Sequence, residues 1–95
     1  MRVTSEMKRK YLSRRIEEIG RIRGQLVSND FSLAQTVGHQ IKGNAKTFEF
    51  PEIAEIGIEM EVAAKKQDRL NLNLCLGHLD EFLNQNRGIF GQQTQ

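Results

Sequence analysis

Residues 33–48 read LAQTVGHQIKGNAKTF, and this stretch decides the fold because its apolar residues recur at helical spacing. At about 100° of rotation per residue, one side of the predicted helix is apolar and the other is polar. The apolar arc holds Leu33, Ala34, Val37, Gly38, Ile41, Asn44, Ala45 and Phe48. The opposite side holds Gln35, His39, Lys42, Gly43 and Lys46. The stretch therefore predicts an amphipathic helix with one buried face.

Two further segments with helical periodicity flank this one. Residues 5–27 place Glu18 and other charged residues away from an apolar stripe made by Tyr11, Leu12, Ile16, Ile19, Ile22 and Leu26. Residues 51–66 begin at Pro51, which suits the first position of a helix because its missing N–H is harmless there. We therefore predict one helix over each of these ranges.

The last segment is ambiguous between a strand and a helix. Four leucines alternate along residues 70–76, as they would in a strand. A helical stripe is also present, and Asp68 is a good N-cap for it; its members are Leu72, Leu76, Leu79, Phe82 and Leu83. The run continues without a turn signal until Gly88, so we predict a helix at 68–86 and a frayed tail at 88–95.

Length and composition indicate one domain over residues 1–95. Ninety-five residues are enough for one hydrophobic core. Short connections between four amphipathic helices, at about 5–27, 32–48, 51–66 and 68–86, predict an all-α, antiparallel up-down-up-down four-helix bundle. The single cysteine, Cys75, excludes an internal disulfide and indicates a reducing compartment. With neither a signal-peptide core nor a spanning segment in the sequence, we expect a cytoplasmic monomer that does not bind membranes.

Charge is distributed unevenly, although the net charge is only +2. Residues 1–24 hold eight Lys or Arg against three Glu, whereas residues 49–61 hold five Glu and no basic residue. A basic patch can bind nucleic acid. Here the patch lies on an amphipathic helix without interleaved aromatic residues, so we expect a solvated face and no nucleic-acid partner. Nucleic-acid binding through residues 1–24 remains an alternative, and it predicts a steep salt dependence.

His39 lies at the centre of the polar face of the predicted helix, with Lys42 and Gly43 one turn further along. Positions three and four apart on a helix are neighbours, so Lys42 places a cation beside the imidazole. A glycine within a helix costs roughly 1 kcal/mol relative to alanine. Close approach of another molecule to the ring would explain that cost at Gly43. An ordinary surface histidine is the alternative interpretation.

The stretch from Leu33 to Asp68 resembles the histidine-containing phosphotransfer (HPt) domain of bacterial two-component signalling. In that family an aliphatic residue, Lys, Gly and small residues follow the histidine, as Ile41, Lys42, Gly43, Asn44 and Ala45 follow His39 here. Residues 47–52 are similar to the family's aromatic-containing turn, and Gln67-Asp68 to its closing dipeptide before the fourth helix. The resemblance implies a four-helix bundle whose exposed histidine receives a phosphoryl group and passes it to a receiver-domain aspartate.

The resemblance also implies a role for individual residues. His39 would be phosphorylated on Nε2, Lys42 would neutralise the phosphoryl oxygens, and Gly43 would leave room for the group. Glu61 matches a glutamate that accepts the histidine's Nδ1–H in the chemotaxis-kinase branch, which would fix the tautomer. Neutral imidazole is a competent nucleophile near pH 7. Residues expected to contact the partner are Gln35, Thr36, Gln40 and Lys46.

The sequence contains no Gly-rich nucleotide loop, no Walker pattern and no carboxylate cluster arranged for Mg²⁺. We therefore expect no intrinsic cofactor. A sensor histidine kinase and response-regulator receiver domains would supply the catalytic apparatus, the receiver contributing Mg²⁺. The chain itself would be a phosphoryl carrier and not an enzyme. The alternative is a non-catalytic helical module that binds receiver or kinase domains without carrying phosphate.

Overall fold

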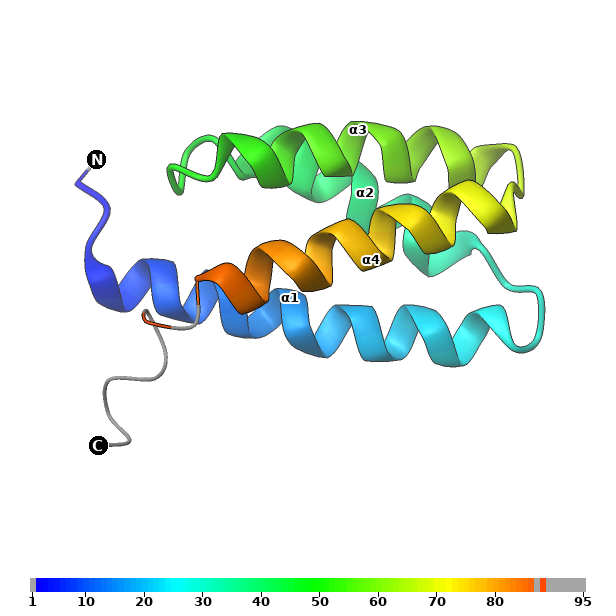
Figure 1. The fold of residues 1–95 in the computed structure, drawn as a ribbon. Helices are drawn as coiled ribbons and strands as arrows, with labels where there is room; N and C mark the ends of the chain where they lie inside the picture. Colours follow the sequence, from blue (N-terminus) through cyan, green and yellow to red (C-terminus); the bar gives the residue numbers. More distant parts are fainter. Residues whose placement is uncertain (1, 87, 89–95) are drawn as a thin grey trace.

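The computed structural model describes residues 2–86 and 88, which form an antiparallel helical bundle (Figure 1). Its helices are α1 (Ser5–Leu26), α2 (Ser32–Asn44), α3 (Pro51–Lys65) and α4 (Arg69–Gln85). No strand occurs within the described residues, so the predicted all-α, up-down-up-down four-helix bundle is confirmed. Both α1 and α3 pack against α2 and α4. The helices α2 and α4 therefore lie diagonally across the bundle from each other.

The helix boundaries follow local capping chemistry. At the start of α1 the Thr4 hydroxyl accepts the Met7 N–H at 3.1 Å, and at the start of α4 the Asp68 carboxylate accepts the Asn71 N–H at 3.1 Å. Each of the three connections contains a residue of positive φ, and the N–H of the next residue bonds to the carbonyl five positions before it. The positive-φ residues are Asn29 (60°), Glu49 (68°) and Gln67 (54°).

The helix α2 ends at Asn44, four residues before the predicted end. Beyond Asn44 the backbone tightens into bonds between residues three apart, such as Phe48 N–H to the Ala45 carbonyl at 3.1 Å. Glu49 then takes the left-handed conformation, and Pro51 starts α3 with its fixed φ. The apolar spacing in the sequence extends to Phe48, beyond the end of α2, because the Phe48 ring packs against the core from the turn that follows the helix.

The other helix limits lie within one residue of the predicted ones, which is the ordinary uncertainty at a helix end. Apart from Gly88, the tail predicted to fray at 88–95 lies outside the described residues.

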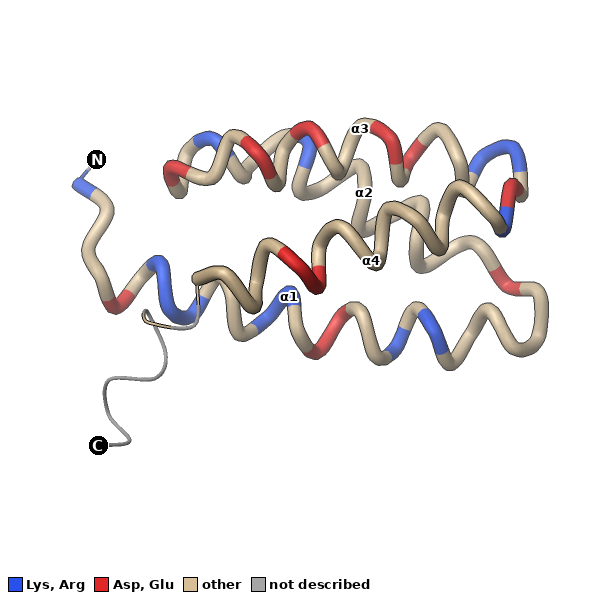
Figure 2. The backbone as a smooth tube through the Cα atoms, viewed as in Figure 1, with Lys and Arg blue, Asp and Glu red and all other residues tan. Residues whose placement is uncertain are grey.

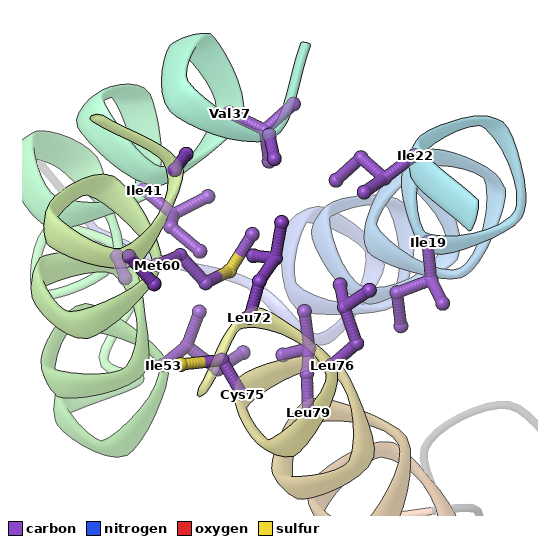
Figure 3. Packing of buried hydrophobic residues seen from close by; sticks show 14 of the residues in the cluster. Ile19, Ile22, Val37, Ile41, Ile53, Met60, Leu72, Cys75, Leu76 and Leu79 are labelled. Atoms are coloured by element: carbon purple, nitrogen blue, oxygen red, sulfur yellow. The ribbon is translucent and has the colours of Figure 1, made fainter. Parts of the chain in front are cut away.

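The hydrophobic core lies along the axis of the bundle and receives side chains from every helix (Figure 3). Met60 and Cys75 are buried there, as their apolar positions predict. The largest fully buried side chains are Leu12, Ile22, Ile41, Ile53, Met60, Leu72, Leu76 and Leu79. Because α2 contributes Val37 and Ile41 to this core, its opposite face, which carries His39, is turned to solvent.

One side of α1 departs from the predicted stripe. Ile16 is 50% exposed, whereas Arg15 and Glu18 are buried, so the predicted burial of Ile16 and exposure of Glu18 were wrong. The Arg15 guanidinium donates hydrogen bonds of 2.7 and 3.1 Å to the Glu18 carboxylate and lies 4.2 Å from the centre of the Tyr11 ring. Hydropathy assigns charged residues to the surface, and only their spacing of three indicates that they pair.

Candidate functional site

The helices α2 and α3 approach each other closely because each has a glycine at their contact. A methyl group at Gly38 would lie 2.8 Å from the backbone nitrogen of Glu61. A methyl group at Gly57 would lie 2.8 Å from the backbone nitrogen of Lys42. These distances are too short for any real Cβ atom. The two glycines therefore let the helices pack closely enough for Glu61 on α3 to reach the side chains of His39 and Lys42 on α2.

We expect Gly57→Ala to destabilise the protein, although alanine is the better helix former by about 1 kcal/mol. The added methyl would lie 2.5 Å from Cγ1 of Ile41 and 2.9 Å from the carbonyl oxygen of Gly38, so the helices must separate. Such overpacking typically costs about 1–3 kcal/mol. Gly20→Ala is the matched control, because a methyl there meets no atom within 4 Å and should stabilise α1. Urea unfolding measures both free energies; equal stabilisation by the two substitutions would contradict the close contact.

His39 projects from α2 on the side away from the core, and its side chain is 67% exposed. Its Nδ1 lies 2.9 Å from Oε2 of Glu61. In the tautomer that this bond favours, Nδ1–H donates to the carboxylate and Nε2 keeps a free lone pair. Within the described residues, no protein group hydrogen-bonds Nε2. The geometry therefore presents an imidazole whose Nδ1 is held by Glu61 and whose Nε2 is available.

Glu61 connects the imidazole to two lysines. Its side chain is 10% exposed; Nζ of Lys42 donates to Oε1 at 2.7 Å, and Nζ of Lys65 lies 3.8 Å from Oε2. The hydrogen bond from Lys42 is the main reason that the pKa of the Glu61 carboxyl lies below its ordinary value. The bond from His39 and the charges of both lysines act in the same direction, against the effect of burial. Glu61 is therefore a carboxylate at neutral pH.

Gly43 lies one turn beyond His39 on the exposed side of α2. A methyl group at this position would meet no atom within 4 Å. No contact within the described part of the chain therefore requires a glycine here, in contrast to Gly38 and Gly57. The space above Gly43 is open to a molecule that approaches the ring.

A shallow hollow surrounds His39. Three of the residues predicted to contact a partner lie in it, since its lining is Ser32, Gln35, Thr36, His39, Gln40, Glu61 and Lys65. Lys46, the fourth, is exposed in the turn after α2 and does not line the hollow. Sequence reasoning missed Lys65, although its spacing of four from Glu61 was a usable signal.

The family comparison agrees with this geometry. The model of the Hpt domain family matches residues 6–87. The chain belongs to the Hpt domain family. Neither the search of curated proteins nor the search of solved structures gives a significant match.

The match to the family model confirms the resemblance seen in the sequence, and it indicates which reaction this kind of domain takes part in. Hpt domains take part in histidine phosphotransfer in phosphorelays, with two-component partners such as receiver domains or kinases. They are phosphocarriers rather than classical enzymes. Among the residues that the structure describes, no helix of this Hpt domain is long and apolar enough to cross a bilayer. Those residues also contain no group of three His, Cys, Asp or Glu side chains placed to hold a metal ion.

This Hpt domain has two histidines, and their surroundings differ. His39 is hydrogen-bonded to a carboxylate on the neighbouring helix. His78 is exposed on α4 beside a groove between α3 and α4, and within the described residues it has no hydrogen-bond or ion-pair partner.

Proposed function

We propose that this Hpt domain accepts a phosphoryl group on Nε2 of His39 and exchanges it with the aspartate of a response-regulator receiver domain. The observation that carries the proposal is the 2.9 Å hydrogen bond from an exposed imidazole to Glu61. It supports a fixed tautomer in which Nε2 is the nucleophile. The exposed position of His39 supports access by a second protein.

In the proposed reaction the lone pair of Nε2 attacks the phosphorus of an aspartyl phosphate, in line with the carboxyl oxygen that leaves. The Nε2–P bond forms as the P–O bond breaks, and the electron pair departs with the aspartate carboxylate. The ring then carries a positive charge, which the Glu61 carboxylate stabilises through Nδ1–H. Transition states of this kind depend mainly on positioning and charge neutralisation. The reverse reaction passes the group to a receiver.

We assign to Lys42 the neutralisation of the phosphoryl oxygens. In the unphosphorylated chain Nζ of Lys42 lies 2.7 Å from Oε1 of Glu61. Lys42 is one helical turn from His39 on α2. A phosphoryl group, which carries a charge of roughly −2, would compete with Glu61 for this cation. Gly43 would leave the space that the group and its donor need. Contacts to the partner are assigned to Gln35, Thr36 and Gln40, with Lys46 at the margin.

The proposed partners are a sensor histidine kinase and receiver domains, and the Mg²⁺ of the transfer is assigned to the receiver. The cytoplasmic location expected from the sequence stays a prediction. The test is to incubate the chain with phosphorylated receiver domains and to look for phosphate that is acid-labile and alkali-stable. Tight binding of receivers or kinases with no transfer of label would instead favour the non-catalytic interaction module.

We expect Glu61→Ala to slow phosphorylation of His39 by about 10-fold, the lower end of the losses seen when the partner that orients a metal-bound histidine is removed. Without the carboxylate, Nδ1–H loses its acceptor and the ring samples both tautomers. Glu61→Gln keeps a neutral acceptor and should lose less. The matched control is Glu59→Ala, an exposed glutamate two residues away. Transfer rates and the ¹⁵N shifts of the ring nitrogens measure the effect; an unchanged tautomer in Glu61→Ala would contradict the assigned role.

A further inference from the structure

An apolar face without a partner in this chain lies on the outer side of α3 and α4. We call it the α3–α4 face, and it consists of Ile58, Val62, Leu70 and Leu74, which are 43–72% exposed. On each helix the two residues are four apart, so they form a line along its surface. The groove between the helices has Ala63 and Cys75 in its lining. Exposed apolar patches of this kind mark interaction sites.

The part of this face on α4 lies across the bundle from the helix that carries His39. The helices α2 and α4 are diagonal, and Figure 1 shows α4 in front of α2. Leu70 and Leu74 lie on the side of α4 opposite to its core residues, and His39 lies on the corresponding side of α2. An occupant centred on α4 therefore leaves the histidine accessible.

Gly77 lies between the turns of α4 that carry Leu74 and Glu81, on the same exposed line. A methyl group there would meet no atom within 4 Å, so no contact in the described part of the chain requires a glycine. Glycine is among the poorest residues for a helix interior, and one benefit that it can offer there is the close approach of another group. A bulky side chain of an opposing helix would fit over this position.

The charge along the groove changes sign from one end to the other. Lys66 follows the end of α3 and lines the groove there, and Glu59 lines it further back along α3. Glu81 does not line the groove but is exposed near the other end of α4. Figure 2 shows basic residues in the turn after α3 and acidic residues further along both helices. These three residues form no ion pair among the described residues, while Asp68 at the lysine end caps α4 and Arg69 donates to the Leu26 carbonyl. A second copy rotated by 180° would set each end against the end of opposite charge. A two-fold contact requires this self-complementarity.

We propose that the α3–α4 face joins two copies of this chain through an antiparallel α4–α4 contact, with Leu74 of each copy packed over Gly77 of the other. The pairing is reciprocal, as a two-fold axis demands. It covers Leu70 and Leu74 and brings the end with Lys66 near Glu81 of the second copy. The proposal departs from the monomer expected from the sequence, because the spacing within α4 did not show that α3 adds Ile58 and Val62 to the same face.

Sedimentation equilibrium of the full chain over a range of concentrations tests the proposal. We expect a dimer for the wild type and a monomer for Leu74→Glu. The matched control is Ile16→Glu, which places the same charge at an apolar side chain that is 50% exposed on α1, outside the face; it should remain dimeric. Gly77→Leu fills the position under Leu74 and should raise the dissociation constant at least 10-fold, with the helical circular dichroism retained.

A charge exchange identifies the orientation. Lys66→Glu should weaken the dimer by about 10-fold, and combining it with Glu81→Lys should restore much of the affinity. A wild-type chain that stays monomeric up to roughly 1 mM overturns the proposal. This holds even if the same face then proves to bind a helix of another protein. A dimer that Leu74→Glu and Gly77→Leu leave intact overturns it as well.

Discussion

His39→Gln is expected to accept no phosphoryl group from any receiver or kinase that phosphorylates the wild-type chain. Glutamine is similar in reach and can hydrogen-bond, but its amide nitrogen has no lone pair that can attack phosphorus. The expected loss is complete within the sensitivity of the assay, because in the proposed function Glu61, Lys42 and Gly43 would supply positioning and space but no nucleophile. Transfer of labelled phosphate from a receiver domain, followed by electrophoresis under alkaline conditions, measures it.

The control for this loss is His78→Gln, which removes the other histidine from an exposed position on α4. It should be phosphorylated at the wild-type rate. His78→Gln, at an exposed position, should also change the free energy of unfolding by no more than about 0.5 kcal/mol. Equal phosphorylation of His39→Gln and wild type would place the reactive group elsewhere.

Glu18→Ala is expected to destabilise the fold more than any other single change discussed above. It leaves the Arg15 guanidinium buried against Tyr11 without the two hydrogen bonds of 2.7 and 3.1 Å that now neutralise it. Removing one partner of a buried ion pair costs about 3–5 kcal/mol. A domain of this size has a total stability of roughly 5–14 kcal/mol, so the loss is a large share. Urea denaturation measures the free energy of unfolding.

Two controls separate the effect of burial from that of pairing. Arg15→Met combined with Glu18→Leu removes both charges and should be close to wild type in stability, since apolar replacement of a buried pair is often neutral. Asp80→Ala breaks the ion pair of 2.8 Å with Arg23, whose two side chains are 48% and 41% exposed. Exposed pairs contribute about 0–1 kcal/mol. Similar losses for Glu18→Ala and Asp80→Ala would contradict the proposed cost of burial.

The fold could be predicted from apolar periodicity because each helix has one stripe that must be covered. The number of helices, their order and the burial of Met60 and Cys75 followed from this pattern alone. Apolar periodicity failed to predict burial where charged side chains pack in the interior or where a turn replaces a helix. Arg15 and Glu18 are buried as a hydrogen-bonded pair, and Phe48 packs against the core although residues 45–48 form a tighter turn than a helix.

The candidate site was predictable only in part. The register of α2 indicated that His39 faces solvent, and the spacing of three placed Lys42 next to it. The distance between His39 and Glu61 depends on how closely α2 and α3 pack, and this depends on Gly38 and Gly57 together. Such a contact between residues 22 positions apart cannot be obtained from the period of one helix. The family resemblance suggested it, and Lys65 lay outside what the resemblance supplied.

The proposed function depends on which nitrogen of which histidine carries phosphate. Nuclear magnetic resonance of the ¹⁵N-labelled chain, phosphorylated by a receiver or a kinase, identifies the nitrogen directly. We predict phosphorus coupled to Nε2 of His39, with Nδ1 still protonated and hydrogen-bonded to Glu61. Phosphate on Nδ1 of His39 or on His78 would contradict the account, as would a chain that every cognate partner binds and none phosphorylates.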